Sequence, residues 1–186
     1  MDYAKKKIPY VHLVTNGSTM TRDLATRLGS TGLNEVSISV DGMEDFHNSV
    51  RGVGNAFTKA WNAIGLLQSH APNIQIVVNS LLTHNNLESL RMLRKEMDAH
   101  YPNVLQKFLP ITKHQLFLTQ DRTSNMIPGV PASGADLKSF IHEAIDSPKT
   151  VNSSLFLKKA YLYLMGQEDV LSEFKRCLYP YHAIEF

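Results

Sequence analysis

Polar side chains that could bind a small molecule gather in one short stretch of the sequence, residues 36–51. Ser37, Ser39 and Asp41 alternate there with aliphatic residues, so a strand at this point has one polar and one apolar face. A strand that is buried on both faces in an α/β protein is normally apolar throughout. The polar face therefore predicts a cavity for a polar ligand, closed by a loop over residues 43–52 at the carboxyl end of the strand.

Arg51 follows this strand and has the chemistry to hold an acidic ligand. A guanidinium binds a carboxylate through parallel, charge-assisted hydrogen bonds. Ser39 can donate or accept a hydrogen bond, and Asp41 can accept one from an ammonium or orient the loop. A simpler interpretation stays open, in which Asp41 lies only in a turn and Arg51 pairs with Glu44 or Asp45 on the surface.

Asn79 is a further candidate, because it lies near the carboxyl end of another apolar run and on the same face as Gln75. His47 is expected to pack within the loop or to cap a helix rather than to catalyse. Ordinary structural roles are expected for the histidines that lack metal-ligand spacing. These are His12, His84, His114 and His142.

Strands and helices alternate along the first part of the chain. Strands are predicted at residues 10–15, 36–40, 74–82 and 104–109, the last one stopped by Pro110. Helices are predicted at residues 18–28, at 55–69 and from residue 87. Ser18 or Thr19 would begin the first helix and Gly29 would end it, and Asn85 or Asn86 would cap the third. This alternation predicts the α/β class, with parallel strands joined by right-handed crossovers.

The pattern changes after residue 112. Residues 119–134 contain several prolines and glycines and are predicted to form a long surface loop. Amphipathic helices are predicted at 135–145 and 154–165. The chain is therefore expected to have two parts, residues 1–112 and residues 113–186.

Composition narrows the class of protein. The chain has 186 residues, of which 43% are hydrophobic and 19% are charged, as in a globular domain. A formal net charge of +2 is too small to indicate a nucleic-acid or anionic-membrane partner. No segment reaches the roughly 18 apolar residues that a membrane helix needs, and the N-terminus lacks a signal-peptide core. A cytoplasmic protein is expected.

Three segments together resemble the middle of the radical S-adenosylmethionine (radical SAM) enzymes. They are Leu13–Gly17, Ser37–Gly42, and His47 followed by Arg51. The resemblance covers roughly residues 8 to 112, and it is closest to members with a C-terminal SPASM-type extension for auxiliary iron–sulfur clusters. It implies a partial (β/α)6 TIM-like barrel, of which this chain holds about four βα units followed by a C-terminal helical segment.

The resemblance also implies a cofactor site. Ser39 and Arg51 would contact the methionyl part of S-adenosylmethionine, Thr15 and Asn79 would line the same cavity, and Asp41 would belong to the same set. The implied activity is reductive cleavage of S-adenosylmethionine by a 4Fe-4S cluster, followed by radical abstraction of hydrogen from a substrate. A peptide or protein is the substrate class to expect, and a reductant is the expected partner.

The cysteine content departs from that family. Cys177 is the single cysteine, so the three-cysteine loop that holds the family's cluster is missing, and this chain alone cannot bind a 4Fe-4S cluster. Cys177 resembles the first cysteine of a SPASM-type extension and is a candidate ligand of an auxiliary cluster; a lone buried thiol is the other interpretation. The chain is interpreted as an interior fragment of a larger enzyme or as a truncated gene product.

Two other functions stay open. The chain could be a catalytically inactive, truncated barrel that serves as a binding or partner module. It could also be a cluster-free α/β-barrel enzyme that uses Asp41, His47 and Arg51 on a phosphorylated substrate.

Overall fold

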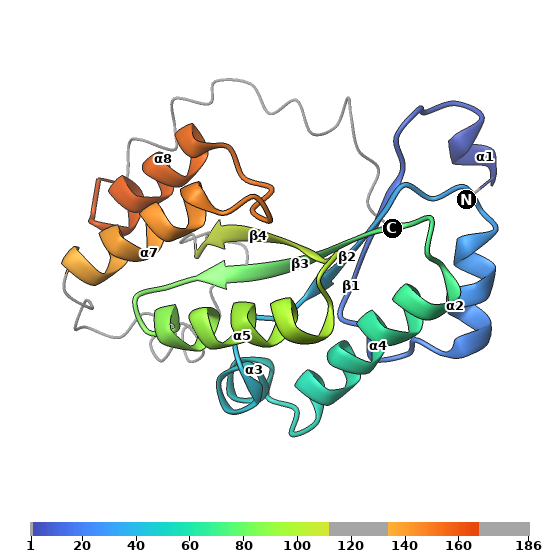
Figure 1. The fold of residues 1–186 in the computed structure, drawn as a ribbon, viewed down its shortest axis with the longest axis horizontal. Coiled ribbons are helices and arrows are strands. Elements are labelled where there is room, and N and C mark those ends of the chain that lie inside the picture. The colour runs from blue at the N-terminus through green and yellow to red at the C-terminus, as the bar shows by residue number, and fades with distance from the viewer. Residues whose placement is uncertain (1, 112–133, 168–186) are drawn as a thin grey trace.

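The computed structural model describes residues 2–111 and 134–167 of the chain. At its centre is a four-stranded sheet, in which all strands are parallel and follow one another in chain order (Figure 1). The strands are β1 (His12–Thr15), β2 (Glu35–Ser39), β3 (Gln75–Leu82) and β4 (Leu105–Pro110). Each connection between neighbouring strands contains at least one helix, as parallel pairing requires.

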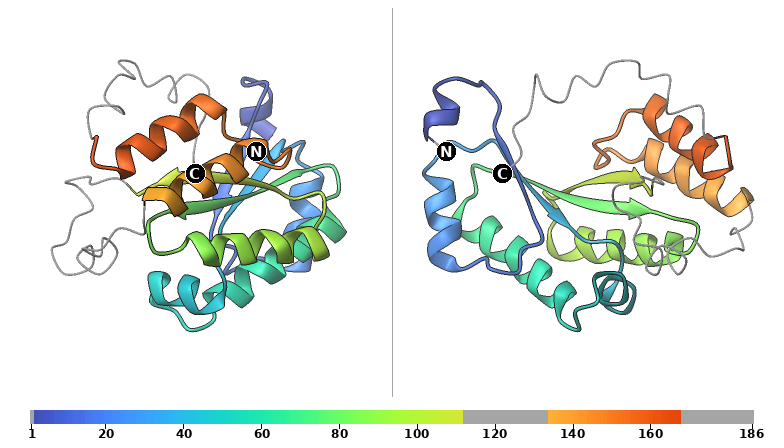
Figure 2. Two further views of the ribbon diagram at one scale, coloured as in Figure 1. Left: turned by 60° about the vertical axis from the view of Figure 1, so that its left-hand side comes forward. Right: turned by 180° about the vertical axis from the view of Figure 1, so that it is seen from behind.

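The described residues form seven helices, and three of them cover one face of the sheet. The seven are α1 (Asp2–Lys5), α2 (Arg22–Gly29), α3 (Glu44–Arg51), α4 (Ala56–His70), α5 (Leu87–His100), α7 (Gly134–Asp146) and α8 (Ser154–Leu164). Figures 1 and 2 show α2, α4 and α5 on the same side of the sheet, with α7 and α8 together beside β4. Among the helices of the described ranges, none is long and apolar enough to cross a membrane.

The hydrophobic core lies between the sheet and α4 and α5. The strands contribute buried aliphatic and aromatic side chains, namely Val36, Ile38, Val40, Ile76, Val78, Leu82 and Phe108. The helices contribute residues at helical spacing, namely Ala60, Ile64 and Leu67 from α4 and Leu90, Leu93 and Met97 from α5. Burial of each large aliphatic side chain contributes about 1.5–3 kcal/mol, so this layer holds the helices to the sheet.

A small polar network crosses this core. Ser80 Oγ donates to Val40 O at 2.7 Å, and Gln106 Nε2 donates to Ser80 Oγ at 3.2 Å. The backbone of Gln106 also pairs beyond the sheet, because its N–H donates to Lys149 O and its carbonyl accepts from Val151 N–H, both at 2.8 Å. The segment before α8 therefore covers the outer edge of β4, while β1 pairs only with β2 among the described residues.

The structure confirms the α/β class, and each predicted strand lies within two residues of its observed bounds. The helices predicted at 55–69, 135–145 and 154–165 are present within one residue of their bounds. The predicted loop over 119–134 lies almost wholly outside the described residues. The arrangement of the strands as part of a partial barrel stays a prediction.

The predicted start of α2 is wrong. The helix begins at Arg22, and Thr21 is its N-cap, whose Oγ1 accepts a hydrogen bond from a backbone N–H in the first turn at 3.2 Å. Ser18 and Thr19 instead lie in a tight turn that starts at Gly17, which has a φ of +74°. Because this turn occupies residues 17–20, the helix can begin only after it.

The two predicted stop signals are also displaced. Gly29 is the last residue of α2, and Ser30 is the C-cap, with a φ of −87° that needs no glycine. Pro110 is the last residue of β4 rather than the residue after it, and it lies opposite Leu82. A proline is tolerated there because it stands at the end of the strand, where the loss of one N–H donor costs little stability.

No helix was predicted between β2 and α4, where the sequence indicated a loop over 43–52. The structure has the eight-residue helix α3 there. Glu44 and Asp45 lie in its first turn, where acidic side chains interact favourably with the helix dipole. Gly52 ends it in the left-handed region with a φ of +65°. Short, polar α3 has no long apolar stripe by which its period could be recognised.

Gly17 and Gly52 both have a positive φ, but only Gly17 is closely surrounded by other residues. Replacing each with alanine therefore distinguishes the cost of backbone strain from the cost of steric overlap. A Cβ on Gly17 would lie 2.8 Å from Ala63 Cβ and 3.1 Å from Ala60 Cα, whereas a Cβ on Gly52 would meet nothing within 4 Å. We expect Gly17→Ala to lower the free energy of unfolding by about 3 kcal/mol and Gly52→Ala by about 1 kcal/mol. Urea unfolding of both variants measures this difference, and equal losses would contradict the packing of the turn against α4.

Candidate functional site

A pocket of about 480 Å³ lies over the face of the sheet opposite the hydrophobic core. Side chains from all four strands and from α3 line it, namely His12, Val14, Ser37, Ser39, Asp41, Arg51, Asn79, Ser80, Leu81, Lys107 and Leu109. Its volume lies in the range of roughly 300–1,000 Å³ that is usual for small-molecule sites. The polar face predicted for β2 is therefore the wall of a pocket.

A row of polar side chains crosses the pocket at right angles to the strands. Ser39, Asn79 and Lys107 are register partners on β2, β3 and β4. Asn79 Oδ1 is buried and has no hydrogen-bond partner within the part of the chain that the structure describes. A buried polar atom without a partner is uncommon in a folded protein and indicates a missing ligand or water. The row therefore offers hydrogen-bonding groups to a guest in the pocket.

Ser37 lies on the same strand and face, but its hydroxyl is engaged. Ser37 Oγ donates to Glu35 Oε1 at 2.8 Å, and Glu35 Oε2 accepts from the Tyr10 hydroxyl at 2.6 Å. Burial, followed by the hydrogen bond and the negative charge of Glu35, raises the pKa of Tyr10 to about 12. Ser37, Glu35 and Tyr10 are thus linked by hydrogen bonds at one end of the pocket. The hydroxyl of Ser39, which also lines the pocket, is not part of these bonds.

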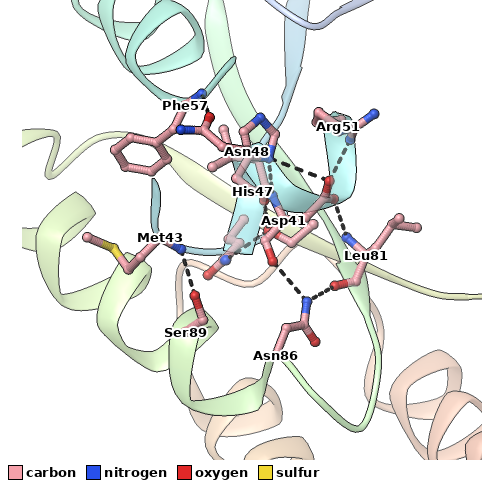
Figure 3. Close-up of polar contacts among 12 residues, drawn as sticks. Asp41, Met43, His47, Asn48, Arg51, Phe57, Leu81, Asn86 and Ser89 are labelled. Atoms are coloured by element: carbon pink, nitrogen blue, oxygen red, sulfur yellow. Dashed lines mark hydrogen bonds and ion pairs between the residues drawn. The ribbon is translucent and has the colours of Figure 1, made fainter. Parts of the chain in front are cut away.

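Asp41 is the most buried charged group of the site, with 1% of its side chain exposed. Its Oδ2 lies 2.7 Å from Arg51 Nη2, and its Oδ1 accepts from Leu81 N–H at 3.0 Å (Figure 3). Burial alone raises the pKa of Asp41. The charge of Arg51 and the hydrogen bond from the Leu81 N–H outweigh burial and hold the pKa of this carboxyl below its usual value.

His47 fixes the backbone where β2 ends. Its Nδ1 accepts a hydrogen bond from Asp41 N–H at 3.0 Å, so this nitrogen carries no proton in that arrangement. The ring is 2% exposed and packs edge-on against Phe57, with the ring centroids 6.4 Å apart. The predicted packing role is confirmed, although His47 lies inside α3 rather than at a cap.

Arg51 points to Asp41 and not to the surface acids (Figure 3). The alternative in which Arg51 pairs with Glu44 or Asp45 is therefore wrong, and so is the alternative in which Asp41 lies only in a turn. Arg51 and His47 are four residues apart and lie on one face of α3, which brings both side chains to the same carboxylate. The Arg51 side chain is 35% exposed and lines the pocket, so part of the guanidinium remains available.

Asn86 and Ser89 hold the loop ends around Asp41. The Asn86 amide Nδ2 donates to Asp41 O at 2.9 Å and to Leu81 O at 2.7 Å, which ties the ends of β2 and β3 together. Ser89 Oγ accepts from Met43 N–H at 2.7 Å and anchors the start of α3 on α5. Asn86 takes the N-cap position of α5, as predicted, but its side chain makes no capping bond because it is used in this network.

One predicted site residue of the described part of the chain does not join the pocket. Thr15 is not among the lining residues, because β1 directs His12 and Val14 to this face; its Oγ1 accepts from Gly17 N–H at 3.1 Å. Cys177, the candidate cluster ligand, lies outside the described residues, as does His114. The ligand roles predicted for Ser39, Arg51, Asn79 and Asp41 stay predictions, but the structure places these four side chains in one pocket.

Lys107 lines the pocket but was not among the residues predicted for the site. Its signal is the alternation within β4, where Gln106 and Phe108 face the core and Lys107 therefore faces the pocket. Within residues 2–111 and 134–167, no three His, Cys, Asp or Glu residues are grouped as metal ligands would be.

No family model matches the sequence. Two curated proteins named AdoMet-dependent heme synthase are similar to part of it: one from Nitratidesulfovibrio vulgaris, 33% identical over 81 residues, and one from Methanosarcina barkeri, 29% identical over 93 residues. The matches cover 43% and 48% of this chain but only 22% and 26% of those proteins. The chain therefore spans about a quarter of the length of these relatives.

Solved structures share the fold. The structure described as native anSMEcpe with bound AdoMet is 17% identical with a TM-score of 0.52, and the match covers 88% of this chain and 38% of that one. The same protein with bound AdoMet and the Kp18Cys peptide gives 16% identity and a TM-score of 0.54 over the same shares. At these identities the likeness shows a shared fold.

Replacement of Asp41 tests the buried ion pair. The pKa of Asp41 is lowered in the folded chain, so its contribution to stability is fully present above the usual value near 3.8 and is lost as pH falls through the folded value. We expect Asp41→Asn to lower the free energy of unfolding by about 3 kcal/mol at neutral pH, because Arg51 loses its partner. The difference from the unmodified chain should shrink below pH 3.8.

Denaturant unfolding between pH 7 and pH 3 measures this dependence. Asp23→Asn is the matched control, because Asp23 pairs with Arg27 at 3.9 Å on the surface and is 83% exposed. Its effect should be small, about 1 kcal/mol or less at neutral pH, because this carboxylate is exposed and interacts only with Arg27 and the first turn of α2. A loss in Asp41→Asn that stays constant with pH would contradict the lowered pKa.

Proposed function

We propose that this chain belongs to the radical SAM enzymes and binds S-adenosylmethionine in the pocket over β2 and β3. The observation that carries the proposal is the row of hydrogen-bonding side chains next to Arg51, on the open face of a parallel sheet. Ser39, Asn79 and Arg51 suit the amino-acid end of S-adenosylmethionine, whose carboxylate and ammonium need donors and acceptors. The unpartnered Asn79 Oδ1 supports a polar guest.

Arg51 keeps enough donors for this role. Its Nη2 faces Asp41, while the remaining N–H groups of the guanidinium carry no partner in the described part of the chain. The buried carboxylate fixes the direction of the guanidinium, so less side-chain entropy is lost when a ligand carboxylate binds. Asp41 acts here as a positioning residue for Arg51.

A 4Fe-4S cluster would supply the electron that cleaves S-adenosylmethionine, but the residues of this chain do not fit one. The sequence contains one cysteine, and such clusters are held by several thiolates. We therefore propose that the cluster cysteines of the working enzyme come from polypeptide other than these 186 residues. The partial match to longer relatives supports an interior fragment.

The finer features of the function are proposals too. A SPASM-type extension with Cys177 as an auxiliary ligand, a partial barrel and a peptide or protein substrate follow from the resemblance alone, and a cytoplasmic location stays a proposal drawn from the sequence. A non-enzymatic binding module is the second candidate, and the single cysteine favours it. The cluster-free enzyme for a phosphorylated substrate is disfavoured, because Asp41 and His47 are buried and engaged with each other, which leaves only Arg51 open to a ligand.

Isothermal titration of the purified chain with S-adenosylmethionine tests the cofactor site. We expect Ser39→Ala and Asn79→Ala each to weaken binding by about threefold to tenfold, because each removes one hydrogen bond to the ligand. Ser37→Ala is the matched control, because this hydroxyl already donates to Glu35. If all three variants bind like the unmodified chain, or if the unmodified chain does not bind, the proposed site is wrong.

Anaerobic reconstitution with iron and sulfide tests the fit of the cluster. The isolated chain should gain no visible absorbance of a 4Fe-4S cluster, because a single thiol cannot replace the missing ligands. A control protein with a known cluster, treated in parallel, shows that the reagents work. A stable cluster in the isolated chain would contradict the proposal that its ligands lie elsewhere.

A further inference from the structure

The charges that line the pocket do not balance. Asp41 and Arg51 neutralise each other at 2.7 Å, at the carboxyl end of β2. Lys107 also lines the pocket, and no acidic side chain of the described residues pairs with it. The lining therefore carries one uncompensated positive charge on β4. A cation within a pocket attracts an anionic ligand, and walls of low dielectric strengthen that attraction.

The neighbours of Lys107 define what kind of anion fits. Asn79 is its register partner on β3, at the strand spacing of about 4.8 Å, and both residues line the pocket, so an amide and an ammonium come from neighbouring positions of one wall. Leu81 and Leu109 flank this pair on the same face. One ammonium and one amide can bind a group with a single negative charge, and the leucine side chains can pack against an aliphatic part of the same ligand. A phosphate, with its higher charge and additional acceptor oxygens, calls for more donors than this wall offers.

We propose that Lys107 and Asn79 form a carboxylate-binding subsite, separate from Arg51. Two sources of the carboxylate share this chemistry. One is the α-carboxylate of S-adenosylmethionine, in which case Lys107 and not Arg51 is its main cationic partner. The other is the carboxylate of a second molecule with an aliphatic body, which would be the substrate. The first source rests on the proposed function, and the second does not require it.

Titrations of the full chain with two matched ligand pairs separate these sources. The first pair is S-adenosylmethionine and its decarboxylated analogue, which differ only in the carboxylate. The second pair is octanoate and octanamide, which share an aliphatic body and differ in charge. Lys107→Met removes the ammonium and keeps most of the stem, Lys107→Arg keeps the charge, and Lys95→Met on the exposed face of α5 is the control.

We expect Lys107→Met to weaken binding of at least one carboxylate by about tenfold and to cause no such loss for the matched ligand that lacks the carboxylate. Lys107→Arg should retain most of the affinity, and Lys95→Met should change nothing. A loss confined to S-adenosylmethionine assigns the subsite to the cofactor, and a loss confined to octanoate assigns it to a second ligand. Thermal unfolding of each variant shows that the fold is intact.

The proposal is overturned if Lys107→Met binds both carboxylates as the unmodified chain does, or if the unmodified chain does not prefer either carboxylate over the matched ligand that lacks it. The proposed function fails separately, when the unmodified chain does not bind S-adenosylmethionine. In that case the preference for octanoate over octanamide still decides whether the subsite exists.

Discussion

The buried carboxylate of Asp41 is the constraint on which the site depends. A charge with 1% of its side chain exposed is stable only when partners replace the lost water; here two elements supply such partners, and a further side chain holds the backbone of the residue. Arg51 comes from α3, the Leu81 N–H comes from β3, and the Asn86 amide holds the backbone of Asp41 itself. The desolvation of one side chain thus fixes the position of a short helix that has little apolar surface of its own.

The sheet consequently has two faces with different tasks. One face is aliphatic and packs on α4 and α5, and its burial provides stability. The other carries Ser39, Asn79 and Lys107 in register, with no helix of the described residues filling the space above them. Polar residues are tolerated there because a guest or solvent can satisfy them. A short strand such as β2 can therefore contribute to the hydrophobic core with one face and to the wall of the pocket with the other.

Much of this could be predicted from the sequence, because period-two alternation reveals the faces of β2 directly. The partner of Arg51 could not, since Asp41, Glu44 and Asp45 all lie close to it in the sequence. The choice among them depends on the rotational phase of α3, and that helix is too short and polar to be recognised from its period. Thr15 was misplaced because its neighbours on β1 were not assigned to faces.

The buried amide of Gln106 has a consequence for the opposite side of the sheet. A slip of β4 by one residue would exchange Gln106 and Lys107 between the two faces, since side chains alternate along a strand. The slip would remove the bond from Gln106 to Ser80 Oγ and the backbone pairs with Lys149 and Val151, and it would bring an ammonium among aliphatic side chains. The hydrogen bonds of Gln106 on the core side of the sheet therefore fix the register of β4, and this register places Lys107 on the side of the pocket.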